Sequence, residues 1–329
     1  MYICEDSLDD LMNAVLKALL SSQNRITPSR GPATEICGVL LELTNPRARL
    51  SRTEKKGKLF SSLGEFLWYL SKSNKLDFIE YYIRDYKEFS DDGKTIHGGY
   101  GRRLFNMRGQ NQIQNVIDLL KKRKDSRQAV IQLFDASDLE QKYKDIPCTC
   151  TLQFLIRNGR LDLLVSMRSN DAFWGLPHDI FAFTMMQEIM ARSLDVEVGS
   201  YKHVVGSLHL YDEKRASAEE YVKEGFQPNV PMPMLPAGDP WPSIQTVLQA
   251  ELKIRRKKSN SLTADSLDPF WFDFVILLEI FARIKEKRTS EIASLRKQLS
   301  CKTYNMYIDL RQARLSAINS VKKTAAVQG

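Results

Sequence analysis

Residues 147–180 of the chain read PCTCTLQFLIRNGRLDLLVSMRSNDAFWGLPHDI. Within this stretch, residues 150–157 and 160–168 have the strand-like composition of two neighbouring β-strands. Asn158-Gly159 between the two runs is a strong signal for a β-hairpin turn. Residues 178–193, which are rich in Phe and Met, predict a long helix directly after the hairpin.

Similar patterns on either side of this stretch predict an α/β domain. Strands are expected from apolar runs and alternation at 34–44, 128–134 and 203–211. Helices are expected from helical spacing of apolar residues at 6–22, 60–70 and 111–124. Glu65 lies on or beside the apolar face of the second of these helices.

The composition changes after residue 226. Residues 227–242, QPNVPMPMLPAGDPWP, are dense in proline and predict an extended linker or surface arm. Beyond them, helices are expected at 243–257, 269–288 and 290–320. We therefore expect an α/β domain at 1–226, a proline-rich linker at 227–242 and a helical C-terminal extension at 243–329.

Composition narrows the function classes. No apolar run approaches the roughly 20 residues that a membrane span needs, and the acidic start MYICEDSLDD is unlike a signal peptide. A cytoplasmic protein is therefore expected. The five cysteines and four histidines are too scattered to predict a disulfide framework or a metal site.

The net charge of +8 is explained either by solvated basic faces or by an anionic ligand. The basic clusters at 121–124 and 255–258 contain no interleaved aromatic residues. They therefore lack the stacking platform of many proteins that bind single-stranded nucleic acid. A phosphorylated small molecule is the favoured ligand, and nucleic acid is not expected.

Cys148 precedes the first strand of the predicted hairpin. A cysteine in such a place is ordinarily a buried small hydrophobic residue. A nucleophilic thiol needs nearby cations, which favour the thiolate. Arg168 ends the second strand of the hairpin, so the predicted pairing places an arginine within reach of the thiol.

Several short motifs resemble those of the thymidylate synthase family in order and approximate spacing, over about residues 6–226. The motifs are Glu65-Phe66-Leu67-Trp68, Tyr100-Gly101, Asp125-Ser126-Arg127, Pro147-Cys148, the run from Arg168 to Pro177, and the run from Gly206 to Tyr211. The resemblance implies a thymidylate synthase-like fold of the α/β (α+β) class, with a large mixed sheet flanked by helices.

The resemblance also implies a chemistry. Cys148 would be the thiolate that adds to C6 of a pyrimidine nucleotide, so that C5 can attack the one-carbon unit of 5,10-methylenetetrahydrofolate, the expected co-substrate. Tyr100 would assist removal of the C5 proton, and Glu65 would order water and carry protons near the base. No metal is implied.

The same resemblance assigns binding residues. Arg168 and Ser169 would hold the phosphate, His209 and Tyr211 a sugar hydroxyl, and Arg127 would reach the partner's site in a homodimer. Arg30 is the candidate for a further phosphate arginine, with Arg25 as the alternative. Asn170 and Asp179 complete the expected nucleotide site, and the expected folate contacts are Asp171, Trp174 and Gly175. Gln128 departs from the family, which usually has a second arginine there.

The residue type at position 179 predicts which base is bound, and here it is aspartate. Thymidylate synthases have asparagine at this position, whose amide matches N3–H and O4 of uracil. An aspartate suits cytosine instead and resembles the deoxycytidylate hydroxymethylases, unless it only caps the following helix. Thr149 after the cysteine and the absence of tryptophan from 79–89 also resemble hydroxymethylases.

The expected function is therefore C5 hydroxymethylation of CMP or dCMP, with tetrahydrofolate as the second product. The alternatives are methylation of dUMP, as in thymidylate synthase, and hydroxymethylation of dUMP. Ribose and deoxyribose are not distinguished. Two other classes of function are less favoured: that of a non-catalytic RNA-binding relative, and a protein-interaction role for Trp241 and Trp271, which are better explained as core residues.

Overall fold

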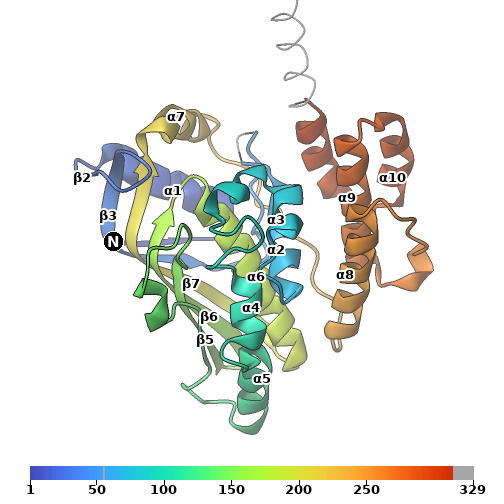
Figure 1. Ribbon diagram of the computed structural model, residues 1–329, viewed down its shortest axis with the longest axis horizontal. Coiled ribbons are helices and arrows are strands. Elements are labelled where there is room, and N and C mark those ends of the chain that lie inside the picture. Colours follow the sequence, from blue (N-terminus) through green and yellow to red (C-terminus); the bar gives the residue numbers. More distant parts are fainter. Residues whose placement is uncertain (55, 314–329) are drawn as a thin grey trace, which may run out of the picture. The chain divides into compact units, whose positions relative to one another are not determined.

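The computed structural model describes residues 1–54 and 56–313, and the chain divides into two compact units (Figure 1). The first unit comprises residues 1–56 and 61–240. The second comprises residues 57–60 and the chain from residue 241 onward. Each unit is built around its own buried side chains and is described by itself.

A seven-stranded mixed sheet forms the centre of the first unit, in the order β1-β3-β7-β6-β5-β4, with β2 beside β3. The pairs β1/β3 and β6/β7 are parallel and the other pairs are antiparallel. The expected mixed sheet flanked by helices is confirmed. The strands are β1 Tyr2–Glu5, β2 Arg25–Ile26, β3 Ala33–Leu43, β4 Val130–Gln132, β5 Thr149–Arg157, β6 Arg160–Asp171 and β7 Glu197–Tyr211.

The predicted hairpin joins β5 to β6. Asn158 and Gly159 have φ angles of 50° and 73°, which are the positive values that a tight hairpin turn requires. Thr149 pairs with Met167 at the open end of the hairpin. The amide of Arg168 then donates to the carbonyl of Cys148 at 2.9 Å. The turn therefore fixes a register that places Cys148 opposite Arg168.

Helices cover one face of this sheet. The helix α6, Gly175–Ser193, packs on β6 and β7, and α1, Leu8–Ser21, packs on β3 and β7 and touches α6. Buried residues surround almost the whole of α6, which explains the lack of a polar stripe in its sequence. The other helices of this unit are α2 Leu59–Leu70, α3 Leu76–Tyr82, α4 Tyr100–Asn106, α5 Gln112–Lys122 and α7 Arg215–Lys223.

The opposite face of the sheet is half-exposed. Along β7, the buried residues Tyr201, His203 and Val205 alternate with the half-exposed Lys202 and Val204. Because successive strand residues point to opposite faces, one face faces the helices and the other is only partly covered by the described residues.

The proline-rich segment has no helix or strand before Trp241, as expected, but it is packed onto the first unit. The amide of Met232 donates to Arg47 O at 2.8 Å, and that of Leu235 donates to Glu188 Oε1 at 2.9 Å. Glu188 also forms a fully buried ion pair with Arg49. The segment is therefore an arm with buried anchor residues rather than a free linker.

The second unit is helical, with α8 Trp241–Arg255, α9 Pro269–Lys285 and α10 Ile292–Gln298. Trp271 is 2% exposed and packs edge-on against Phe274, which confirms that it is a core residue. Trp241, expected to be a core residue as well, is only half-buried, at the first position of α8. The expected continuous helix 290–320 is wrong within the described residues, because the chain leaves α10 at Leu299. Residues 314–320 of that expectation lie outside the described part.

The interruption has a physical cause in Asp273. This buried carboxylate accepts hydrogen bonds from the amides of Ser300 and Cys301 at 2.7 and 2.8 Å, and from Ser300 Oγ at 2.8 Å. Those amides are thus satisfied by a side chain of α9 rather than by a continuing helix.

All of the net charge lies in the C-terminal part of the sequence. Residues 1–240 contain 32 basic and 32 acidic residues, whereas residues 241–329 contain 16 and 8. The overall charge therefore gives no support to an anionic ligand in the first unit, where local charges must be considered instead. Across the described ranges, no helix is long and apolar enough to cross a membrane.

We predict that Asp273→Asn destabilises the second unit by about 2 kcal/mol, because a hydrogen bond to a charged group contributes about 1.5–3 kcal/mol. Faster amide hydrogen exchange at Ser300 and Cys301 would report the loss directly. Asp265→Asn, at an exposed position, is the control and should change stability by less than about 0.5 kcal/mol. Unchanged protection at both amides would contradict the anchoring role.

Candidate active site

Cys148 lies immediately before β5, half-buried, with Arg168 beside it. Arg168 donates from Nε to Pro147 O at 2.9 Å and from Nη2 to Ile146 O at 2.9 Å. Its Nη2 also lies 3.8 Å from Cys148 Sγ. The two carbonyl contacts fix the guanidinium while leaving it exposed on its outer side. The expected closeness of Arg168 to the thiol is confirmed.

Burial raises the pKa of the Cys148 thiol to about 11, although the charges of Arg168 and Arg30 oppose the shift. The nearby carboxyl groups of Asp179 and Asp145 raise it further. The thiol is therefore protonated at neutral pH in the ligand-free protein. Chemistry at this sulfur requires an acceptor for its proton.

The two candidate N-terminal arginines differ in their surroundings. Arg25 pairs with Asp212 and donates to Thr34 Oγ1 at 2.9 Å. Arg30 instead lies with its guanidinium 4.2 Å from the centre of the Phe89 ring, and its charge acts on Cys148. The structure thus places Arg30, and not the engaged Arg25, at the site.

Asp179 lies inside α6 and does not cap it. The helix begins at Gly175 with Trp174 at the N-cap position, so the capping role considered for Asp179 is excluded. Its Oδ2 accepts a hydrogen bond from Asn170 Nδ2 at 2.8 Å. Burial and the neighbouring carboxyl group of Glu65 raise the pKa of Asp179 well above its usual value.

Glu65 is 7% exposed on α2. Its Oε1 accepts hydrogen bonds from Tyr69 Oη at 3.1 Å and from Tyr86 Oη. Burial raises the pKa of Glu65, and the two hydroxyl groups oppose this shift. The expectation that Glu65 is not a surface carboxylate is confirmed. The two tyrosines that hold it were not predicted from the sequence.

Tyr100 is the first residue of α4 and is buried. Its hydroxyl oxygen accepts hydrogen bonds from the amide of Thr149 at 3.1 Å and from Thr149 Oγ1 at 2.9 Å. Burial raises the pKa of Tyr100 well above its usual value, and Asp179 and Cys148 add to the shift. Tyr100 therefore stays protonated and is fixed next to the residue that follows Cys148.

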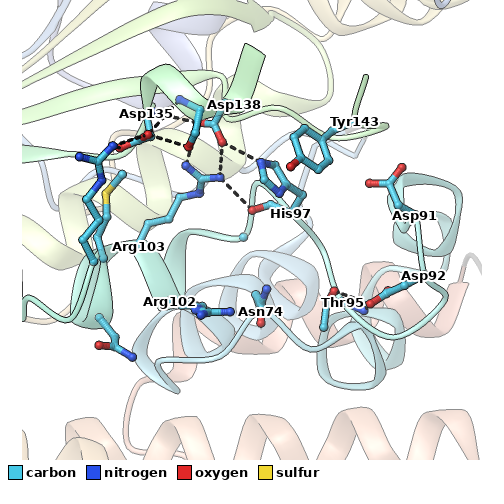
Figure 2. Close-up of a pocket in the computed structure, with 15 residues that line it drawn as sticks. Asn74, Asp91, Asp92, Thr95, His97, Arg102, Arg103, Asp135, Asp138 and Tyr143 are labelled. Carbon is cyan, nitrogen blue, oxygen red and sulfur yellow. Dashed lines mark hydrogen bonds and ion pairs between the residues drawn. The ribbon is translucent and has the colours of Figure 1, made fainter. Parts of the chain in front are cut away.

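A hollow of about 440 Å³ lies beside the segment that carries Tyr100, and neither Cys148 nor Asp179 lines it. Figure 2 shows Arg103 pointing toward Asp138, with His97 beside the guanidinium and in contact with the same carboxylate. Arg103 binds both carboxylate oxygens of Asp138, at 2.7 and 2.8 Å, and the carbonyls of Leu133 and His97. These contacts anchor α4, and with it Tyr100, to the segment after β4.

The pairing of β6 with β7 aligns the expected sugar and phosphate residues. Asp171 pairs with His209, and Ser169 with Ser207. Ser169 Oγ lies 3.5 Å from His209 Nδ1, a long contact, and the His209 ring meets Tyr211 edge-on at 5.0 Å. His209 is 7% exposed.

The turn after β6 presents an aromatic surface. Asp171 Oδ1 accepts from the amides of Phe173 and Trp174 at 2.7 and 2.9 Å. Trp174 is 42% exposed, and Lys56 Nζ lies 3.5 Å from the Phe173 ring centre and 4.7 Å from that of Trp174. Lys56 itself is 4% exposed, so its ammonium group packs on these rings, and the indole of Trp174 is the exposed flat surface of this turn.

Gly175 follows this turn in close contact with Asn170 and Asp179. A side chain there would bring its Cβ to 3.0 Å from Asn170 Nδ2 and 3.4 Å from Asp179 Oδ2. The glycine thus leaves room for the hydrogen bond between those two residues.

A family model described as thymidylate synthase matches residues 9–259. The chain belongs to the thymidylate synthase family. The match includes the whole of the site around Cys148 and all of α8.

Three similar proteins are each named deoxyuridylate hydroxymethyltransferase. That of Pseudomonas phage M6 is 36% identical over 163 residues, 49% of this chain and 46% of its own. That of Bacillus phage SP01 is 32% identical over 233 residues, which are 66% of this chain and 60% of its own. That of Delftia phage PhiW-14 is 30% identical over 220 residues, which are 62% of this chain and 61% of its own. The chain spans about half to three fifths of the length of these relatives.

Arg127, which was expected to contribute to the site of a partner subunit, makes no hydrogen bond or ion pair with the described residues around Cys148 in its own chain. Within the described ranges, the guanidinium of Arg127 has no hydrogen-bond or ion-pair partner, and it is exposed. Only its backbone is engaged, because Gln153 Nε2 donates to Arg127 O at 2.9 Å. Arg127 is therefore available for a contact outside its own chain.

Two buried residues that sequence reasoning missed, His203 and Tyr201, extend the Asn170–Asp179 contact into the sheet. The signal that could have found them is a polar ring inside an otherwise alternating strand. No group of three or more His, Cys, Asp or Glu side chains suited to a metal ion occurs in residues 1–54 and 56–313.

We predict that Asp179→Asn stabilises the protein more at pH 8 than at pH 5. The folded protein keeps a proton on Asp179 at pH values where the unfolded chain, with its ordinary pKa near 3.8, has lost it. The free energy of unfolding therefore falls as pH rises above that ordinary value, until the raised pKa is passed. The Asp179→Asn variant has no ionisable group at this position, so its free energy of unfolding does not show this fall with pH.

The measurement is the melting temperature of wild type and variant at both pH values. Asp195→Asn, at an exposed position, is the control and should show no pH-dependent difference. An equal effect of Asp179→Asn at pH 5 and pH 8 would contradict the protonated state of Asp179.

Proposed function

We propose that this chain hydroxymethylates C5 of a pyrimidine nucleoside monophosphate, with Cys148 as the nucleophile and cytosine as the base. The observation that carries the proposal is the juxtaposition of Cys148 with Arg168, Tyr100 and Asp179 in a member of the thymidylate synthase family. The names of the three phage relatives support transfer of a hydroxymethyl group.

In the proposed reaction, 5,10-methylenetetrahydrofolate supplies the one-carbon unit when bound. Cys148 loses its proton and adds to C6 of the base, which makes C5 nucleophilic. C5 would then attack the one-carbon unit, so that a C5–CH2 bond forms and C5 loses its proton. The bond from this CH2 carbon to the folate nitrogen would break, which releases tetrahydrofolate as the second product, and water would add to the CH2 carbon as its new hydroxyl group. The bond at C6 is then broken, and the sulfur leaves as thiolate.

The side chains around Cys148 have separate tasks in this proposal. Arg168, Arg30 and Ser169 bind the phosphate, because guanidinium groups bind phosphate in a bidentate manner. His209 and Tyr211 bind the sugar hydroxyl. Tyr100 and Glu65, the latter with Tyr69 and Tyr86, handle protons near C5. Trp174, Asp171 and Gly175 form the side toward the folate.

Cytosine is proposed because of Asp179. Its carboxyl group is held protonated by burial and by Glu65, so it offers one donor and one acceptor to the base. Ring N3 of cytosine accepts and its 4-amino group donates, which such a carboxyl group can match. Hydroxymethylation of dUMP is the second candidate, favoured by the printed names of the relatives.

A homodimer that shares Arg127 is also part of the proposal. Leu40, Val204 and Leu164 are half-exposed neighbours on one face of the sheet. Gln153, on the same face, holds the backbone of Arg127. A second copy of the chain packed on this face would cover the apolar residues and meet the exposed guanidinium.

We predict that Cys148→Ala lowers turnover by roughly a thousandfold or more, because the covalent step is lost, whereas nucleotide binding survives. Hydroxymethyl product is measured by mass, and binding by calorimetry. Cys150→Ala, two residues along and also half-buried, is the matched control and should stay active. Substantial turnover by Cys148→Ala would rule out the covalent mechanism.

We predict that Asp179→Asn shifts the preference from cytosine toward uracil nucleotides by about a hundredfold in relative kcat/KM. Donor and acceptor are exchanged at two positions, and each buried mismatch costs about 1–3 kcal/mol. The assay compares CMP with UMP and dCMP with dUMP for both proteins. A ratio that does not move would mean that Asp179 does not read the base.

We predict that mixing inactive Arg127→Ala with inactive Cys148→Ala subunits restores activity. Half of the exchanged dimers would be hybrids, and each hybrid would have one intact site out of two. The activity should therefore approach about a quarter of the wild-type activity. Arg123→Ala, a nearby surface arginine, should be active by itself. If verified subunit exchange restores nothing, Arg127 is not shared.

A further inference from the structure

A chain of hydrogen bonds runs from Asp179 into the sheet. Asn170 Nδ2 lies 2.8 Å from Asp179 Oδ2, and Asn170 Oδ1 lies 3.2 Å from His203 Nε2. His203 Nδ1 lies 2.7 Å from Tyr201 Oη. Tyr201 and His203 are 0% exposed and Asn170 is 3% exposed, so water does not compete for these contacts.

The hydrogen bonds between Tyr201, His203, Asn170 and Asp179 can be donated in either of two directions. Burial lowers the pKa of His203 to about 3, so the ring is neutral and carries one N–H. In the forward direction Tyr201 donates to Nδ1, Nε2 donates to Asn170, and the amide donates to Asp179. In the reverse direction Asp179 donates to the Asn170 carbonyl, the amide donates to Nε2, and Nδ1–H donates to Tyr201.

The hydroxyl of Tyr201 decides between the two. In the forward direction its proton lies in the bond to His203. In the reverse direction that proton has no acceptor among the described residues, since His203 is the only partner of Tyr201 Oη in them. A buried donor without a partner is costly. The forward direction is therefore favoured.

We propose that Tyr201, His203 and Asn170 are positioning residues that hold Oδ2 of Asp179 as a hydrogen-bond acceptor, leaving Oδ1 to carry the proton toward the base. This inference rests on the proposed function, because it names the residues that would set the preference of the site for cytosine. The hydroxyl oxygen of a carboxylic acid is the poorer acceptor, so the Asn170 contact assigns the proton to Oδ1.

The assigned proton discriminates between bases. Donation from Oδ1 matches ring N3 of cytosine, whereas N3–H of uracil would face another donor. For the protonated carboxyl group to accept from N3–H of uracil, its proton must move from Oδ1 to Oδ2. Oδ2 then donates to Asn170, so the direction of all the hydrogen bonds reverses, which strands the Tyr201 hydroxyl. The expected preference for cytosine from this source is roughly 10- to 100-fold.

The test compares Tyr201→Phe with wild type in the affinity for dCMP and dUMP, measured by calorimetry without folate. Without the Tyr201 hydroxyl, Nδ1 of His203 has no hydrogen-bond partner in either direction of the hydrogen bonds. The preference for dCMP should therefore fall by about tenfold or more. Tyr221→Phe is the matched control, because it removes another buried hydroxyl, which donates to Asp9 Oδ1 at 2.6 Å. Its ratio should equal that of wild type.

A second measurement needs no variant. With four histidines in the chain, nitrogen NMR of ¹⁵N-histidine-labelled protein should show a neutral His203 with its proton on Nε2. Protonation on Nδ1, an unchanged affinity ratio in Tyr201→Phe, an equal change in both variants, or a wild-type preference for dUMP would overturn the inference. Binding of dCMP without hydroxymethyl product would contradict the proposed function alone.

Discussion

The register of the β5–β6 hairpin is the constraint on which the rest of the site depends. The turn at Asn158-Gly159 sets the pairing, and the bond from Arg168 N to Cys148 O at 2.9 Å ends it. The same register places Thr149 where it can bond to Tyr100. A slip by one residue would send Arg168 to the other face of the sheet and separate the cation from the thiol.

The second constraint is the shortage of water around the acidic groups. Burial raises the pKa of Asp179, and the charge of Glu65 adds to this shift. The hydroxyl groups of Tyr69 and Tyr86 donate only to Glu65, where they oppose the rise in pKa that burial causes. Burial likewise raises the pKa of the Cys148 thiol in the ligand-free protein. In the proposed function, a nucleotide phosphate would meet the cations of Arg168 and Arg30 beside these buried groups.

The sequence predicts the parts of this structure that depend on local pattern and motif order. The hairpin, the long helix after it and the buried Glu65 follow from alternation, turn chemistry and helical spacing. The partners Tyr86, His203 and Tyr201 could not be predicted, because they come to the site only through tertiary packing. The helix expected over 290–320 is broken for the same reason, since the carboxylate of Asp273 lies far away in sequence.

The base and the transferred group can both be identified from the mass of the nucleotide product after incubation of wild-type protein with CMP, dCMP, UMP or dUMP and 5,10-methylenetetrahydrofolate. We expect a cytidine nucleotide with a hydroxymethyl group at C5, together with tetrahydrofolate and no rise in absorbance from dihydrofolate. Turnover of dUMP to a methylated product with dihydrofolate, and none of either cytidine nucleotide, would contradict the proposed function.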